Sequence, residues 1–133
     1  MASGTRKATG QLGETIAAQY LVRKGFKIIG RNYRKPWGEI DIIAEKDATV
    51  RFVEVKTVTR ESSGNLLSRE IDHEPEELVD NRKLRKVART ASLYMEETRD
   101  QREYQIDVVG VILNNRTKTA TCRLFEQVLG DRL

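Results

Sequence analysis

Two periods in the spacing of apolar residues predict which segments of the chain are helices and which are strands. Apolar residues recur at intervals of three and four over residues 10–24 and again over 80–98, as in helices with one buried face. Gly25 follows the first of these segments as a natural helix stop. We therefore predict one helix over about residues 10–24 and a second over about residues 80–98.

The segments around these helices alternate between apolar and polar residues, as strands with one buried face do. Pro36 interrupts the pattern and predicts that residues 32–38 connect two strands. The predicted strands are 26–29, 38–44, 50–58, 105–113 and a last short one at 119–125.

This order of elements predicts the fold class. A helix, three strands, a second helix and one or two strands fit an α/β fold with a mixed central sheet flanked by helices. Residues 59–79 show no sustained period and are expected to form a long acidic loop. With 133 residues, the chain is expected to form one domain over 1–133.

Charged residues interrupt two of the predicted strands where buried strands normally carry apolar side chains. If the strands close through a two-residue turn at 47–48, Asp41 lies opposite Glu54 and Glu39 opposite Lys56. Two carboxylates at that distance repel by about 4 kcal/mol at an effective dielectric constant of 20. A cation between them would remove this repulsion.

A divalent metal ion suits this pair of carboxylates. Mg²⁺ commonly uses one or two carboxylates together with water, so we expect Mg²⁺ or Mn²⁺ at Asp41 and Glu54, with the Val55 carbonyl as a further ligand. Lys56 would orient or deprotonate an attacking water. The alternative is a hairpin whose solvent-facing side carries ordinary salt bridges.

Glu14 is a further candidate for this site. It lies at the margin of the apolar arc of the first predicted helix, and from there it would reach the same metal, directly or through water. The alternative is a glutamate that the helix dipole favours near the N-terminus of a helix.

The charge is distributed unevenly along the chain. Twenty-four Lys and Arg against twenty Asp and Glu give a net charge of +4, but the net charge is +6 over 1–60, −6 over 61–80 and +4 over 81–133. The basic part of the chain favours a polyanion such as nucleic acid, although an uneven solubilising surface would give the same count. Candidate nucleic-acid contacts are Arg34, Lys35, Arg82, Lys83, Arg85, Lys86 and Arg89.

Several classes of protein are excluded or disfavoured. Cys122 is the only cysteine, which excludes a disulfide within the chain and a cysteine-based zinc site. No apolar run is long enough for a transmembrane helix, and no secretory signal opens the chain. We therefore expect a cytoplasmic protein without a membrane partner. His73 has no second histidine at metal-ligand spacing and is expected at the surface.

The strand motifs also carry a family resemblance. The sequence resembles the bacterial YraN-type family of predicted nucleases, which is similar to compact members of the PD-(D/E)xK superfamily of restriction endonucleases and archaeal Holliday-junction resolvases. The resemblance extends from about residue 10 to 113. It rests on GE at 13–14, GF at 25–26, RNYR at 31–34, GEIDIIA at 38–44 and FVEVK at 52–56.

The resemblance implies a restriction-endonuclease-like fold and assigns roles to single residues. It implies that Asp41 and Glu54 are metal ligands, that Lys56 is the catalytic lysine and that Glu14 is the helix-borne acidic residue of resolvase-like members. It also matches Asp107 to an aspartate of the family's following strand. The basic run that opens the family's second helix falls on Arg82, Lys83, Arg85 and Lys86.

Three departures from the family pattern stand out. Ile40 replaces the superfamily's nominal proline, and Gln105 stands where the family often has a basic residue. The acidic segment 61–80 is longer and more negative than usual, and would obstruct or gate the site.

Together these observations predict a Mg²⁺-dependent or Mn²⁺-dependent endonuclease that hydrolyses phosphodiester bonds. We expect DNA as the substrate, with branched or structured DNA as an option that a homodimer would suit. The alternatives are a non-catalytic nucleic-acid-binding module and an adaptor that binds a basic partner through the acidic segment.

Overall fold

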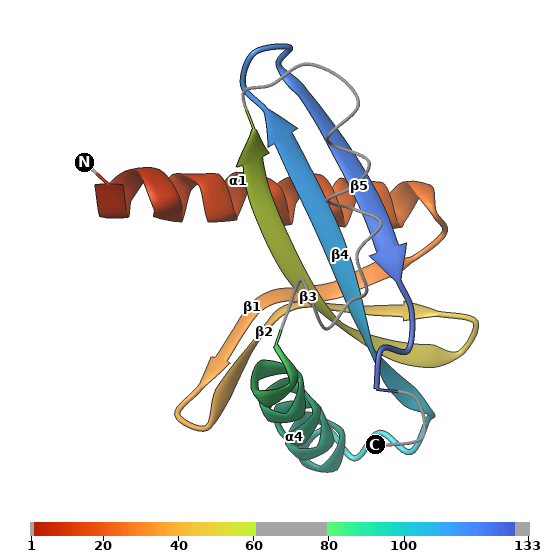
Figure 1. Cartoon of the computed structure of the whole chain (residues 1–133). Helices are drawn as coiled ribbons and strands as arrows, with labels where there is room; N and C mark the ends of the chain where they lie inside the picture. Colours follow the sequence, from red (N-terminus) through yellow and green to blue (C-terminus); the bar gives the residue numbers. More distant parts are fainter. Residues whose placement is uncertain (1, 61–79, 130–133) are drawn as a thin grey trace.

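The computed structural model describes residues 2–60 and 80–129 (Figure 1). Most of the predicted acidic loop, residues 61–79 with His73, lies outside the described residues. The elements are α1 (Ala2–Arg23), β1 (Lys27–Lys35), β2 (Gly38–Lys46), β3 (Thr49–Arg60), α4 (Asn81–Glu97), β4 (Tyr104–Asn114) and β5 (Thr119–Phe125).

The strands form one mixed sheet in the order β1-β2-β3-β4-β5. Strands β3 and β4 are parallel, and the other three neighbouring pairs are antiparallel. A parallel pair needs a crossover connection, and α4 lies between β3 and β4 in the chain. The predicted α/β class, mixed sheet and order of elements are confirmed.

The two helices pack on opposite faces of this sheet. Ala17 and Leu21 of α1 belong to one buried cluster, and Leu84 and Val87 of α4 belong to the other. Figure 1 shows α1 crossing the sheet at a steep angle to β4, and α4 near the end where β1 and β2 lie. The site residues therefore lie on strands that are covered from both sides.

The β2–β3 hairpin closes as predicted. Asp47 and Ala48 form a two-residue turn with φ of 53° and 63°, the left-handed values that the tight hairpin turns require. The strands pair from Lys46↔Thr49 to Ile42↔Val53, and in every pair the residue numbers sum to 95. The predicted register is confirmed over these five pairs.

Three details of the predicted elements are wrong. The first helix begins at Ala2 rather than at residue 10, and β1 extends to Lys35, because residues 32–35 pair with β2 instead of forming a connection. Ile40 packs with the α4 cluster although Ile42 packs with the α1 cluster, so the strict alternation predicted for 38–44 fails between them. This is where β2 stops pairing with β3.

Each helix approaches the sheet closely through one glycine. A Cβ atom on Gly13 of α1 would collide with the side chain of Thr57 on β3, and one on Gly38 of β2 would collide with Thr90 on α4. Because glycine has no side chain at these two positions, each helix can lie close to the strands that carry the candidate site. Among the described residues, no helix is long and apolar enough to cross a membrane.

Candidate metal and active site

The candidate site lies where β2 separates from β3. The last paired residues are Ile42 and Val53, so Asp41 and Glu54 are not ladder partners, and neither are Glu39 and Lys56. The Asp41 side chain takes the place of the missing ladder bond, since its Oδ2 accepts a 2.8 Å hydrogen bond from the backbone N–H of Val55. The ladder ends three pairs before the Glu39–Lys56 pair, so the predicted pairings of Asp41 with Glu54 and of Glu39 with Lys56 are not formed, but the Asp41 side chain remains tied to β3.

Glu54 is the most deeply buried carboxylate of the site, with only 3% of its surface exposed. Burial, the charge of Asp41 and a hydrogen bond between the two carboxyl groups raise the pKa of Glu54 to about 8, although Lys83 opposes this rise. The two carboxylates therefore lie close enough to disfavour simultaneous ionisation, although they are not ladder partners.

Lys83 of α4 extends to Glu54 of β3. Its Nζ lies 2.6 Å from Glu54 Oε2 and forms an ion pair with this buried oxygen, which has no other partner. Burial would lower the pKa of Lys83, but its contact with Glu54 prevails and the pKa is raised. Lys83 is thus held in its charged form beside the carboxylates.

Glu14 of α1 approaches the same place. Its Oε1 is buried without a hydrogen-bond partner. Burial and the charge of Asp41 raise the pKa of Glu14, while Arg31 and Arg34 act in the opposite direction. The structure thus brings Glu14 close to Asp41, as predicted from its place on the helix.

An open pocket of about 620 Å³ joins these groups, and Lys56 lies on its wall as an exposed side chain. Val55 also lines this pocket. The N–H and C=O of one strand residue point to the same side, so the Val55 carbonyl faces the gap that Asp41 occupies. Four of the predicted site residues thus line one pocket, namely Glu14, Asp41, Val55 and Lys56. Glu54 lies beside them through its contacts with Asp41 and with Lys83, which also lines the pocket.

Within residues 2–60 and 80–129, no three His, Cys, Asp or Glu side chains gather closely enough to hold a metal ion by themselves. A divalent ion at this site would rely on Asp41 and Glu54, with the Val55 carbonyl and water as further ligands. One or two carboxylates with several waters are an ordinary set for Mg²⁺.

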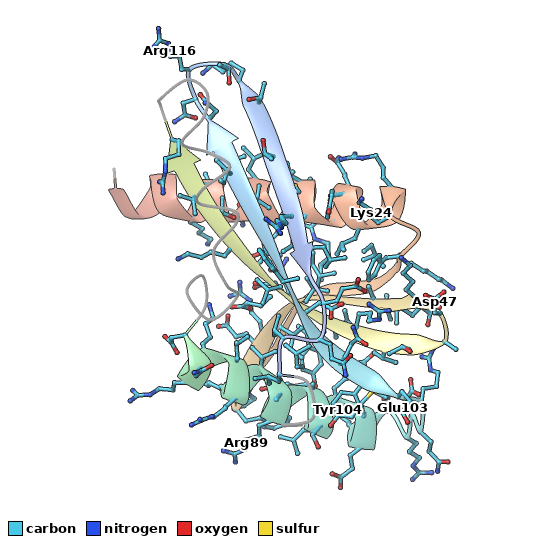
Figure 2. All side chains as sticks on the ribbon, turned by 45° about the vertical axis from the view of Figure 1, so that its right-hand side comes forward. Lys24, Asp47, Arg89, Glu103, Tyr104 and Arg116 are labelled. Carbon is cyan, nitrogen blue, oxygen red and sulfur yellow. The ribbon has the colours of Figure 1, made fainter. Side chains whose placement is uncertain are left out.

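The candidate nucleic-acid contacts fall into separate groups. Arg34 lines a groove with Lys7 beside Glu14, whereas Lys35 pairs with Glu97 at 3.6 Å. Arg82 and Lys86 line a groove with Lys83. Arg85 and Arg89 lie around another pocket on the far side of α4, and Figure 2 shows Arg89 pointing away from the protein. The basic residues of α4 therefore line two different pockets, one on each flank of the exposed face of the helix.

The chain matches the model of an uncharacterised protein family, UPF0102, over residues 13–111. The chain belongs to this family. A UPF0102 protein of Syntrophomonas wolfei is 39% identical over 107 residues, which cover 80% of this chain and 85% of the relative. One of Moorella thermoacetica is 37% identical over 117 residues, covering 87% and 90%. One of Fervidobacterium nodosum is 38% identical over 108 residues, covering 79% and 74%.

This membership confirms the resemblance to the YraN-type family, which is the UPF0102 group. The matched range includes every acidic candidate of the site together with Lys56 and Lys83. The family is described as uncharacterised. The comparison therefore shows the family of the chain, and its chemistry has to be inferred from the geometry of the site.

Sequence reasoning missed two features of this UPF0102 protein. It assigned Lys83 to nucleic acid and did not foresee its ion pair with Glu54, which joins residues far apart in the chain. It also missed the buried pair of Arg51 and Asp107, to which Gln105 donates a 2.8 Å hydrogen bond. The signal that the sequence offered was one charged residue inside each of two largely apolar strands, Arg51 in β3 and Asp107 in β4.

Proposed function

We propose that this protein is a metal-dependent nuclease that hydrolyses phosphodiester bonds of nucleic acid, with DNA as the expected substrate. The observation that carries the proposal is the Asp41–Glu54 carboxylate pair, in which Asp41 lines an open pocket and the buried Glu54 Oε2 has no hydrogen-bond partner. Perturbed titratable groups in a pocket are typical of functional sites.

The residues fit a divalent cation. Glu54 Oε2 and Glu14 Oε1 are buried oxygens without hydrogen-bond partners, and the mutual repulsion of Asp41 and Glu54 favours a cation of more than one charge. The Val55 carbonyl adds a neutral oxygen on the same side. All of these are the hard oxygen ligands that Mg²⁺ and Mn²⁺ prefer.

Each side chain would have a definite task. When bound, a divalent ion supplies Lewis-acid polarisation of the scissile phosphate and a lowered pKa of bound water. Lys56, exposed on the pocket wall, would orient the attacking water and offset the charge that develops on the phosphate oxygens. Glu14 Oε1 would accept a hydrogen bond from that water, because it has no other partner.

The grooves beside the pocket support a polyanionic substrate. One groove shares Gly10 and Glu14 with the central pocket and continues to Lys7 and Arg34. Another groove shares Lys83 with the central pocket and continues along α4, where the basic residues Arg82 and Lys86 line it. A strand laid along this path would place phosphates at both ends and one over the carboxylate pair.

The test is cleavage of labelled single-stranded, duplex and branched DNA, and of RNA, with Mg²⁺ or Mn²⁺. We expect Asp41→Asn, Glu54→Gln and Lys56→Met each to lower the rate by at least about a hundredfold, because each removes a group that acts on the reacting atoms. EDTA should abolish cleavage by the wild type.

Two matched controls accompany these variants. Asp47→Asn changes a carboxylate in the β2–β3 turn, where asparagine suits the positive φ, and Lys118→Met changes an exposed lysine beyond β4. Both should cut like the wild type. If the wild type binds nucleic acid but cuts none of the substrates with either metal, the protein is a binding module and the proposal is wrong.

A further inference from the structure

The first turn of α4 fixes Lys83 over the carboxylate pair. Asp80 caps the helix, and its Oδ1 accepts a 2.8 Å hydrogen bond from the backbone N–H of Lys83. The Lys83 side chain then extends to Glu54, with Nζ 2.6 Å from Oε2. Both the backbone and the side chain of this residue are therefore anchored.

The contact joins two very different environments. The Glu54 side chain is 3% exposed, whereas the Lys83 side chain is 60% exposed. Moving the ammonium group into the adjoining groove would take it from a partly exposed place to a more exposed one. Moving Glu54 would require repacking of β3. Lys83 is consequently the partner that can leave.

The oxygen that Lys83 contacts is also the one that a metal ion needs. Glu54 Oε2 has no hydrogen bond, and one ammonium charge is set against the two carboxylates of Asp41 and Glu54. A dication at this oxygen and an ammonium group 2.6 Å from it would repel each other strongly in so buried a place. The two cations therefore exclude one another.

We propose that Lys83 is a resident counter-cation of the carboxylate pair, that a divalent ion must displace it, and that the displaced ammonium group then binds a substrate phosphate. This inference rests on the proposed metal-dependent function. Lys83 lines both the central pocket and the groove with Arg82 and Lys86, so a phosphate site lies within its reach. Metal and nucleic acid then bind cooperatively, since each favours the displaced position of Lys83.

The test compares Mn²⁺ binding by wild type and Lys83→Met by calorimetry, without nucleic acid. We expect Lys83→Met to bind Mn²⁺ with an affinity about tenfold higher, a usual size for coupling between two sites. Lys118→Met, which removes an exposed lysine outside the proposed binding path, should bind Mn²⁺ like the wild type. Lys83→Arg, which keeps the charge, should also bind like the wild type.

Cooperativity is tested with an oligonucleotide in a Lys56→Met background, where cleavage is suppressed. The oligonucleotide should raise the Mn²⁺ affinity several-fold when Lys83 is present and should leave it nearly unchanged in Lys83→Met. If Lys83→Met does not fold, as judged by circular dichroism, Lys83→Gln replaces it in both experiments.

The outcomes separate this inference from the proposed function. Equal or weaker Mn²⁺ binding by Lys83→Met, with clear binding by the wild type, overturns the role of Lys83 and leaves the metal site intact. Absence of Mn²⁺ binding in both proteins removes the metal site itself, and the inference with it. Tighter binding in Lys83→Met together with loss of the oligonucleotide effect supports the inference.

Discussion

Two buried charge clusters lie on the same sheet, and they differ in how completely their carboxylates are paired. In the Arg51–Asp107 cluster, Asp107 is fully buried, its Oδ2 accepts a 3.1 Å bond from Arg51, and its Oδ1 accepts bonds from Gln105 and the Gln127 backbone. Arg51 also pairs with Glu126 at 2.7 Å, but that carboxylate is half exposed to solvent. In the Asp41–Glu54 pair, two carboxylates share one lysine, and one buried oxygen has no hydrogen bond.

This difference shows which cluster stabilises the fold and which is suited to a ligand. A buried carboxylate with every oxygen satisfied gains nothing from a further cation. In the Asp41–Glu54 pair, by contrast, repulsion between the two carboxylates makes Glu54 retain a proton up to a pKa of about 8, and a divalent cation can take the place of that proton. Strands β3 and β4 thus carry a structural ion pair at one position, and β2 and β3 carry a candidate metal site at another.

The largest expected effect comes from breaking the structural cluster. Arg51→Met leaves Asp107 buried without its cation, so we expect the free energy of unfolding to fall by about 3 to 5 kcal/mol. Urea denaturation measures this. Arg102→Met, which breaks exposed pairs with Asp100 and Glu45, should cost far less than Arg51→Met. A loss of under about 1 kcal/mol for Arg51→Met would contradict the assignment.

Mn²⁺ binding gives a second test of the difference between the Arg51–Asp107 cluster and the Asp41–Glu54 pair. Arg51→Met should retain the Mn²⁺ affinity of the wild type, because the Arg51–Asp107 cluster lies apart from the candidate ligands.

The second effect is a pH dependence that the Asp41–Glu54 pair creates. The pKa of Glu54 is raised from 4.5 to about 8, so between these values the native state holds a proton that the unfolded chain releases. The free energy of unfolding without metal therefore falls as the pH rises from 5 to 8, by on the order of 2 to 3 kcal/mol.

Glu54→Gln is the control for this pH dependence, because glutamine does not titrate. Burial also raises the pKa of Asp107, which adds a fall of the same sign in both proteins, so the quantity to compare is the difference between them. Equal slopes for wild type and Glu54→Gln in urea titrations from pH 5 to 8 would contradict the prediction.

The smallest effect concerns the distance between α1 and the carboxylate pair. Gly13→Ala places a Cβ atom against Thr57 of β3, so we expect a loss of about 1 to 2 kcal/mol and a displaced Glu14. Gly10→Ala is a matched control in the same helix, since a Cβ atom there meets nothing within 4 Å. It should be neutral or stabilising by up to about 1 kcal/mol. Thermal unfolding distinguishes the two, and equal melting temperatures would show that the close approach is unimportant.

Much of the site was predictable because it depends on local rules. The turn at Asp47–Ala48 sets the hairpin register, and this register puts Asp41 and Glu54 at the same end of the ladder, just beyond its last pair. The ladder nevertheless ends at Ile42↔Val53, and the Asp41 side chain bonds to the Val55 backbone. That departure depends on how β2 packs between the two helices, with Ile40 in one buried cluster and Ile42 in the other. The alternation of apolar and polar residues does not carry this information.

The sequence by itself determined the order of helices and strands, the class of sheet and the register of the central hairpin, because periodicity and turn chemistry act over a few residues. Only the tertiary structure decided which cation faces Glu54. Lys83 is distant from Glu54 in the chain, and α4 brings it there by packing on the sheet. The same holds for Arg51 and Asp107, whose charges meet only because β3 pairs with β4.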